Sequence, residues 1–121
     1  MTIAIVGSRS IYKEKYKKQI TEIIIKMGAT AIITGGAKGI DEMALEIANK
    51  EGIKIKIIRP EKHSEPWRNK VAPLERNTKI VQEANHIIAI WDGQSKGTRD
   101  VILKSQKLKK PIEIIENNLF T

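Results

Sequence analysis

The first segment whose residue types suit phosphate chemistry lies near the start of the chain, where Gly7, Ser8 and Arg9 are consecutive. Glycine lets the backbone approach a ligand closely, and the serine hydroxyl can donate a hydrogen bond. An arginine can bind a phosphate with two parallel N–H donors. A tight turn with an exposed arginine uses the same residue types, so this segment alone favours an anion site without separating it from a turn.

A second segment, residues 35–41, is richer in glycine and lies between a predicted strand and a predicted helix. It consists of Gly35, Gly36, Ala37, Lys38, Gly39, Ile40 and Asp41. The first amides of a helix and its dipole attract an anion, and Lys38 adds a positive charge. The spacing is G-G-x-x-G, which differs from the G-x-G-x-x-G of dinucleotide-binding proteins. Asp41 fits either a ligand contact or an ordinary carboxylate in the first helical turn.

A third polar segment, residues 92–98, again leads into a predicted helix. It consists of Asp92, Gly93, Gln94, Ser95, Lys96, Gly97 and Thr98. Thr98 suits a ligand contact, but it also suits a helix cap. Earlier in the chain, Arg76 and Asn77 offer a guanidinium and a carboxamide that match a phosphate or a base edge. We expect these residues to contribute to the same anion site as the first two segments.

Other kinds of site find little support in the residue types. The chain has no cysteine and two histidines, which excludes thiol nucleophiles and makes a zinc cluster untenable. His63 and His86 have no paired carboxylates nearby, so we interpret both as structural. Trp67 and Trp91 each suit stacking on a base, but packing within the protein is the favoured role.

The elements that must position these residues follow from apolar periodicity, which predicts strands and helices in alternation. We place strands at residues 2–6, 29–34, 53–58, 86–91 and 112–115. We place helices at 11–27, 40–51, 74–84 and about 97–109, with Gly28 and Gly52 as stop signals. Residues 59–73 contain Pro60, Pro66 and Pro73, so this stretch is predicted to be a long ordered loop.

Alternating apolar strands and helices predict an α/β fold with a parallel sheet covered on both faces. The expected architecture is a Rossmann-like three-layer α/β/α sandwich, with five parallel strands in the order 3-2-1-4-5. In such sheets, ligands bind beyond the carboxyl ends of the strands at the point where the strand order reverses. That rule places the site between the strands at 2–6 and 86–91, where the three polar segments converge.

Length and composition set the remaining limits. The 121 residues suit one domain, to which we assign all of residues 1–121. No apolar run is long enough for a membrane span and no signal peptide is evident, so we expect no membrane association and a cytoplasmic protein. The net charge of +8 makes polyanions natural partners. A hyperthermophile composition, or an AT-rich genome, would explain the same excess of basic residues.

Taken in order, these motifs resemble the SLOG superfamily of Rossmann-like nucleotide-binding proteins. The similarity is to its YspA-like and DNA-processing-protein-A-like members, which are related to the Lonely Guy family. It extends from residue 3 to about 115 and rests on Gly7-Ser8-Arg9, Gly35-Gly36-Ala37-x-Gly39-x-Asp41, Arg76-Asn77 and Trp91-Asp92-Gly93-x-Ser95-x-Gly97-Thr98. The resemblance implies a nucleotide pocket with phosphate-binding loops at Gly35, Gly36, Gly39, Gly97 and Thr98, beside the Arg76-Asn77 pair.

The resemblance also implies several possible activities on that pocket. Some relatives bind single-stranded DNA, others sense ligands similar to ADP-ribose, and the Lonely Guy branch hydrolyses nucleoside monophosphates. The hydrolase branch has a Pro-Gly-Gly-x-Gly-Thr loop followed by a glutamate, whereas this chain has Trp91-Asp92-Gly93 there. The nearest following acid is Asp100. Hydrolysis of an N-glycosidic bond would therefore need Asp100, or failing that Asp41 or Asp92, as its carboxylate.

We expect this protein to bind a phosphate-bearing nucleotide or nucleotide derivative at the carboxyl edge of its sheet, as a ligand-binding or sensor module. No cofactor is expected to be required. The alternatives are a single-stranded DNA binder of the DNA-processing type and a nucleoside monophosphate phosphoribohydrolase. Because the chain is short, action on DNA would need self-association or a partner, so a homo-oligomer belongs among the expected partners.

Overall fold

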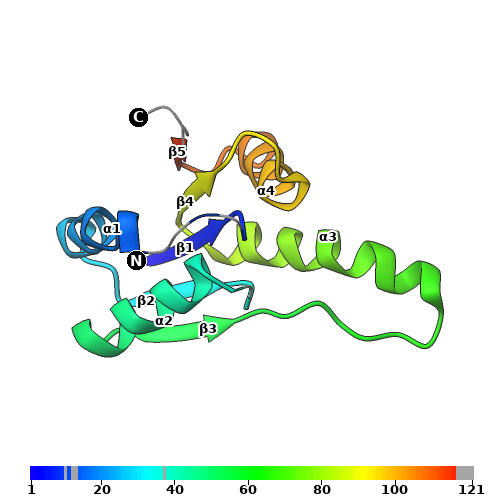
Figure 1. Ribbon diagram of the computed structural model, residues 1–121, viewed down its shortest axis with the longest axis horizontal. Coiled ribbons are helices and arrows are strands. Elements are labelled where there is room, and N and C mark those ends of the chain that lie inside the picture. The colour runs from blue at the N-terminus through cyan, green and yellow to red at the C-terminus, as the bar shows by residue number, and fades with distance from the viewer. Residues whose placement is uncertain (10, 12–13, 37, 117–121) are drawn as a thin grey trace.

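Five parallel strands form one sheet in the order β3-β2-β1-β4-β5, as predicted (Figure 1). The computed structural model describes residues 1–9, 11, 14–36 and 38–116. Its strands are β1 (Thr2–Gly7), β2 (Ala31–Thr34), β3 (Lys54–Ile57), β4 (His86–Trp91) and β5 (Ile112–Glu116). Every pairing between neighbouring strands is parallel. The prediction of a parallel α/β sheet is therefore confirmed.

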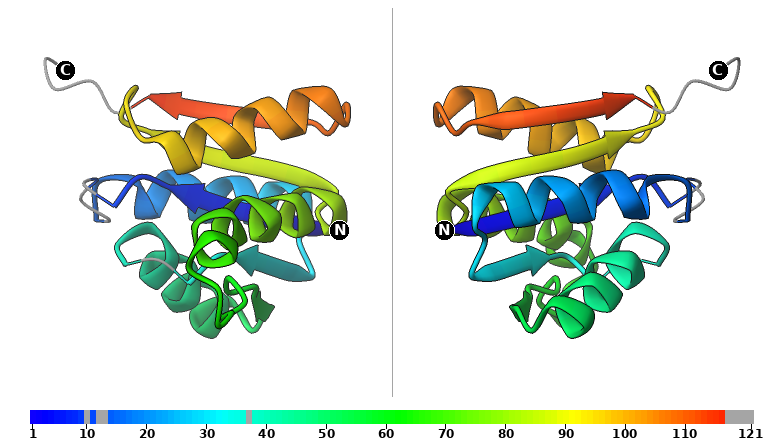
Figure 2. Two further views of the ribbon diagram at one scale, coloured as in Figure 1. Left: turned by 90° about the vertical axis from the view of Figure 1, so that its right-hand side faces the viewer. Right: turned by 90° about the vertical axis from the view of Figure 1, so that its left-hand side faces the viewer.

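Helices cover both faces of this sheet. They are α1 (Glu14–Met27), α2 (Ile40–Glu51), α3 (Pro66–Glu83) and α4 (Lys96–Lys107). Ile24 of α1 shares a core with Ile3 of β1 and with buried residues of α2, whereas Val101 of α4 shares one with Ala4 and with buried residues of α3. Neighbouring strand residues point to opposite faces, so α1 and α2 lie on one face and α3 and α4 on the other (Figure 2).

The strand order reverses at β1, with β2 and β3 on one side and β4 and β5 on the other. Right-handed crossovers in opposite directions put the connecting helices on opposite faces, which explains the three layers. Gly7 pairs with Ile90 in register, so β1 and β4 end at the same edge of the sheet. This edge lies at the reversal point, where open α/β sheets bind ligands.

Helix α3 differs from the sequence prediction, because it begins at Pro66 and includes Pro73. The predicted loop over residues 59–73 was therefore wrong for residues 66–73. Proline is compatible with the first position of a helix, where its missing N–H would have no intrahelical partner. Pro73 breaks one hydrogen bond within the helix, but Ile80 and Val81 anchor the following turns in the core.

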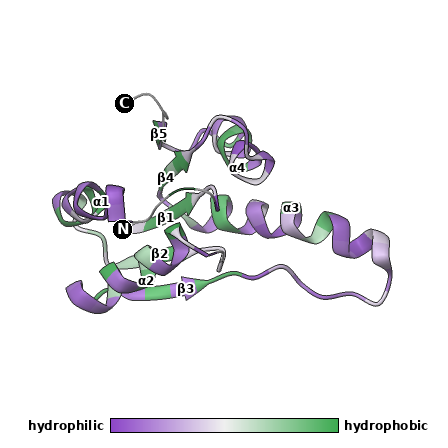
Figure 3. Cartoon of the chain, viewed as in Figure 1, coloured by the Kyte–Doolittle hydropathy of each residue, from purple (hydrophilic) through white to green (hydrophobic). Residues whose placement is uncertain are grey.

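The first part of α3 extends past the sheet (Figure 1). Residues 66–71 are exposed, and Ala72 is the first residue of this helix to be buried. Figure 3 shows hydrophobic residues on the central strands and largely hydrophilic residues in the outer part of α3. None of the helices in the described part of the chain is long and apolar enough to span a membrane.

Candidate functional site

A cleft of about 480 Å³ lies at the carboxyl ends of β1 and β4. It is lined by these predicted site residues: Gly7, Arg9, Gly35, Asp41, Arg76, Asn77, Asp92, Ser95, Gly97 and Thr98. The structure thus brings together residues from all three polar segments and from the Arg76-Asn77 pair. Apolar lining comes from Val6, Pro73, Ile80 and Val101, which the sequence analysis did not single out.

The other predicted site residues do not line this cleft. Ser8 is buried below the surface, and Lys38 is exposed. Gly36, Gly39, Gly93 and Asp100 are also absent from the lining. Ala37 lies outside the described residues.

Arg76 connects helix α3 to the glycine segment that follows β2. Its Nη1 donates a hydrogen bond to the carbonyl oxygen of Gly35 at 2.7 Å, and its Nε donates to Oδ1 of Asn77 at 2.9 Å. Burial lowers the pKa of the Arg76 guanidinium, the negative charge of Asp41 raises this pKa, and the positive charge of Arg9 lowers it. The charges of Asp41 and Arg9 therefore act on Arg76 across the cleft. An arginine keeps its proton near neutral pH, so the cleft carries two permanent positive charges.

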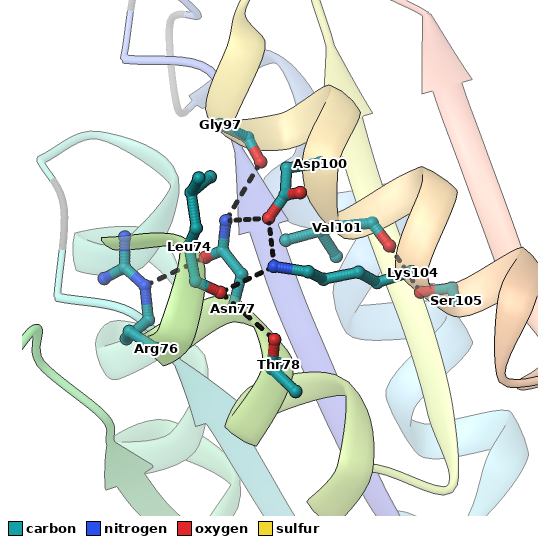
Figure 4. Close-up of polar contacts among 9 residues, drawn as sticks. All are labelled: Leu74, Arg76, Asn77, Thr78, Gly97, Asp100, Val101, Lys104 and Ser105. Carbon is teal, nitrogen blue, oxygen red and sulfur yellow. Dashed lines mark hydrogen bonds and ion pairs between the residues drawn. The ribbon is translucent and has the colours of Figure 1, made fainter. Parts of the chain in front are cut away.

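Asn77 is the centre of a polar network that joins α3 to α4 (Figure 4). Its Nδ2 donates to Oδ2 of Asp100 at 3.0 Å and to the carbonyl oxygen of Gly97 at 3.3 Å. Lys104 donates to the same Asp100 oxygen at 2.8 Å and to the carbonyl oxygen of Leu74 at 2.6 Å. The buried Asn77 amide is thus held in one orientation by its neighbours.

This network determines what Asp100 can do. Its Oδ2 accepts from Asn77 and Lys104, and the side chain is not part of the cleft lining. A carboxylate that acts on a developing oxocarbenium ion must reach the reacting sugar. The geometry therefore favours a positioning role for Asp100, through Asn77 and Lys104. Its catalytic role stays a prediction.

Ser8 and Asp92 organise the backbone at the end of the two central strands. Ser8 N donates to the carbonyl oxygen of Ile90 at 3.1 Å, and Asp92 N donates to Ser8 Oγ at 3.2 Å. Oδ1 of Asp92 accepts from the amides of Gln94 at 2.9 Å and Ser95 at 2.7 Å. Side-chain bonds of this kind stabilise a turn, and here the turn brings the start of α4 to the cleft.

Helix α4 presents its first turn to the cleft. Ser95 is its N-cap residue and makes no side-chain capping bond, while Thr98 lies inside the helix and is buried. Thr98 is therefore not the cap that the sequence also allowed. Gly97 has open space where a side chain would stand. The first amides of a helix attract anions, so the Gly97 and Thr98 end of α4 suits a phosphate.

Gly35 and Gly36 are each packed against an arginine. A Cβ added to Gly35 would lie 2.6 Å from Nη1 of Arg76, and a Cβ added to Gly36 would lie 2.6 Å from Nη1 of Arg59. Gly36 also has a φ of +81°, which side chains other than glycine rarely adopt. Arg59 was not among the predicted site residues. The signal was its position directly after the predicted strand at 53–58, at the edge where the other polar segments converge.

Helix α2 begins beside the cleft, with Gly39 as an N-cap that has a φ of 81° and no side-chain capping bond. Asp41 is buried in the first turn of α2 and also lines the cleft. Both interpretations of Asp41 therefore agree with its place. As an anion in the cleft, it partly offsets the charge of the arginines.

Neither tryptophan lines the cleft. Trp91 donates from Nε1 to the carbonyl oxygen of Ser95 at 3.1 Å and packs on the core, which fits the favoured structural role. Trp67 is 65% exposed in the outer part of α3. His63 is fixed through its backbone, which exchanges two hydrogen bonds with the Asn69 side chain. Within residues 1–9, 11, 14–36 and 38–116, no group of acidic or histidine side chains is arranged to hold a metal ion.

The chain is similar to the family described as DNA recombination-mediator protein A, whose family model matches residues 1–89. Among solved structures, DNA processing protein A from Helicobacter pylori matches with a TM-score of 0.73 and 22% identity, over 98% of this chain and 66% of that chain. That structure concerns the single-stranded DNA binding mode of the Helicobacter pylori protein.

DNA processing protein A from Streptococcus pneumoniae matches with a TM-score of 0.75 and 18% identity, over 98% of this chain and 51% of that chain. At these identities, the likeness to both structures concerns the fold alone. The chain spans less than two thirds of the length of either protein. A search of curated protein sequences gives no match.

Proposed function

The chain belongs to the DNA recombination-mediator protein A family, and on that premise we propose that its cleft binds single-stranded DNA. The observation that carries this proposal is the pair of guanidinium groups, from Arg9 and Arg76, in a cleft that also receives the first turn of α4. Arginines and helix N-termini are common partners of phosphate groups. The net charge of +8 supports the same partner, because it draws a polyanion to the surface.

The apolar part of the cleft supports a nucleic acid whose bases are unpaired. Val6, Pro73, Ile80 and Val101 line it beside the charged residues. A base in a duplex hides its faces by stacking, whereas a single strand can place a base or sugar against an apolar wall. Phosphate contacts to the arginines and apolar contacts to the wall would then be made by one nucleotide unit.

The volume of the cleft supports a second candidate function, binding of a small nucleotide or nucleotide derivative as a sensor module. Small-molecule sites occupy about 300–1,000 Å³, and the cleft of about 480 Å³ falls in this range. Both candidates use the same residues, and they differ in how many phosphates contact the protein. Salt dependence separates them, because each phosphate contact of a single strand contributes about 0.7 to the log-log slope.

We do not extend the proposal to hydrolysis. Of the acids named for this step, Asp100 accepts hydrogen bonds from Asn77 and Lys104 and lies outside the lining. Asp41 and Asp92 do line the cleft, but Oδ1 of Asp92 accepts from the amides of Gln94 and Ser95 and Asp41 is buried in the first turn of α2. The hydrolase function would be supported if the protein released free base from a nucleoside monophosphate and Asp100→Asn abolished this activity. Localisation to the cytoplasm, the absence of a required cofactor and homo-oligomer formation stay predictions from the sequence.

The test is a titration of a fluorescent oligothymidylate of about 16 nucleotides, at about 50 and 200 mM salt. Arg9→Ala and Arg76→Ala should each weaken binding by about tenfold or more, since each removes a charged hydrogen-bond donor. Arg68→Ala is the matched control, because Arg68 lies outside the lining and forms a 3.9 Å ion pair with Glu65. The proposal fails if the wild-type chain does not bind, or if both cleft variants bind like the control.

A further inference from the structure

Arg59 is an exposed arginine that the cleft itself does not include. It follows β3 by two positions, at the carboxyl edge of the sheet. Its Nη1 and Cζ would lie 2.6 and 3.2 Å from a Cβ on Gly36, so its guanidinium is packed against this glycine. A long flexible side chain thus has a defined contact beside the candidate site.

The donors of Arg59 are uncommitted, in contrast to those of Arg76. Arg76 gives hydrogen bonds to Gly35 and Asn77. Across the described ranges, Arg59 has neither a hydrogen-bond acceptor nor a carboxylate partner. A guanidinium presents five N–H donors, so Arg59 can take a phosphate without giving up an existing contact.

Two consecutive glycines are therefore packed against two different arginines, Gly35 against Arg76 and Gly36 against Arg59. Consecutive Cα atoms are about 3.8 Å apart, so the two guanidinium groups are held close to one short stretch of backbone. Gly35 lines the cleft and Gly36 does not. Arg76 therefore lies in the lining of the cleft, and Arg59 lies immediately outside it.

We propose that Arg59 binds the phosphate next to the one held in the cleft, so that the site takes two consecutive nucleotides of a strand. This inference rests on the proposed function of the cleft. A mononucleotide has a single phosphate group. When the cleft arginines bind this phosphate, no second phosphate is left to contact Arg59. A strand supplies the next phosphate along its backbone. Arg59 therefore distinguishes a strand from a mononucleotide.

The experiment compares wild type, Arg59→Ala, Arg59→Lys and the control Arg68→Ala with two probes. The probes are thymidine 5′-monophosphate, followed by NMR chemical shifts, and the fluorescent oligothymidylate. Arg59→Ala should weaken oligothymidylate binding about tenfold, as expected for a charged hydrogen bond, and lower the salt slope by about 0.7. It should leave thymidine 5′-monophosphate binding within about twofold. Arg59→Lys should keep the slope and lose part of the affinity, because lysine is a single-point donor.

Each outcome bears on a different claim. Failure of the wild-type chain to bind oligothymidylate overturns the proposed function of the cleft, and the role of Arg59 with it. If the wild type binds but Arg59→Ala loses no more affinity than Arg68→Ala, the role of Arg59 alone is overturned. An equal loss for both probes also overturns it, because Arg59 would then act within the cleft. Thermal unfolding of each variant confirms that the exposed substitutions leave the fold intact.

Discussion

Arg76 Nη1 donates to the carbonyl oxygen of Gly35 at 2.7 Å, across 41 positions of the sequence. This bond connects the loop after β2 to the middle of α3. The arginine is thus oriented by a backbone oxygen while its charge remains available to the cleft. Preorganised donors of this kind bind an anion with little loss of side-chain freedom.

Gly35→Ala should weaken DNA binding without much change in stability. The added Cβ would lie 2.6 Å from Arg76 Nη1, and this flexible end of the arginine must move away. We expect a loss of about tenfold in oligothymidylate affinity, because a positioned charged donor is displaced. The free energy of unfolding should change by about 1 kcal/mol or less. Fluorescence anisotropy and thermal unfolding measure the two effects, and unchanged affinity would contradict the role given to the Gly35–Arg76 bond.

Gly97→Ala should move stability and binding in opposite directions. Gly97 lies in α4, and a Cβ there has nothing within 4 Å, so alanine fits the folded chain. Gly97 does not have a positive φ, and replacing glycine with alanine at a compatible backbone conformation stabilises a protein by about 0.4–1 kcal/mol. The new methyl group, however, stands in the cleft lining, where a phosphate would approach the first turn. Higher thermal stability with unimpaired DNA binding would show that the ligand does not approach α4 at this point.

The Asp100–Lys104 pair should prove structural. Oδ2 of Asp100 lies 2.8 Å from Lys104 Nζ, and both side chains are partly buried, with 22% and 25% exposed. Removing Asp100 takes one acceptor from Lys104, which keeps the Leu74 carbonyl, and one from Asn77, which keeps the Gly97 carbonyl. Because a charged hydrogen bond is lost, Asp100→Ala should destabilise the protein by about 1–3 kcal/mol. A double-mutant cycle with Lys104→Met in urea unfolding should give a coupling energy of about 0.5 kcal/mol or more. Additive effects of the two changes would contradict a direct interaction.

DNA affinity should be almost independent of pH between about 6 and 9. The cations of the cleft are arginines, and no histidine is among its lining residues. Burial lowers the pKa of Arg76, but an arginine stays charged throughout this range. Because the proton count does not change, the affinity should vary by no more than about twofold. A larger change of affinity within this range in anisotropy titrations would contradict the assignment of the phosphate contacts to arginines.

The fold could be predicted from the sequence because each strand and helix is indicated by its own short stretch of residues. Strand β1 and strand β4 are apolar runs that end in polar, glycine-containing segments, and the rules of parallel crossovers then leave few topologies. The expected order was confirmed. The resemblance to DNA-processing-protein-A-like members of the SLOG superfamily was confirmed by the family match over residues 1–89.

The parts that were missed depend on contacts between distant segments. Pro66 and Pro73 read as loop residues, although packing of the later turns of α3 makes one helix of residues 66–83. Arg59 gains its place only through the backbone of Gly36, which no spacing rule connects to it. The apolar wall of the cleft uses Val6, Ile80 and Val101, whose types suit any hydrophobic core. Sequence patterns indicate which residues are polar, but the neighbours of each residue follow from the assembled sheet.

Pro73 divides α3 into two parts that should differ in hydrogen exchange. Proline has no N–H, so the carbonyl oxygen of Asn69 lacks its usual partner within the helix. Ahead of this break, residues 66–71 are exposed, whereas Ile80 and Val81 behind it are buried. Amide protons before Pro73 should therefore exchange through local fraying, and those around Ile80 only through opening of the core. Pro73, which lines the cleft, thus lies at the boundary between a part of α3 that opens readily and a part that is held in the core.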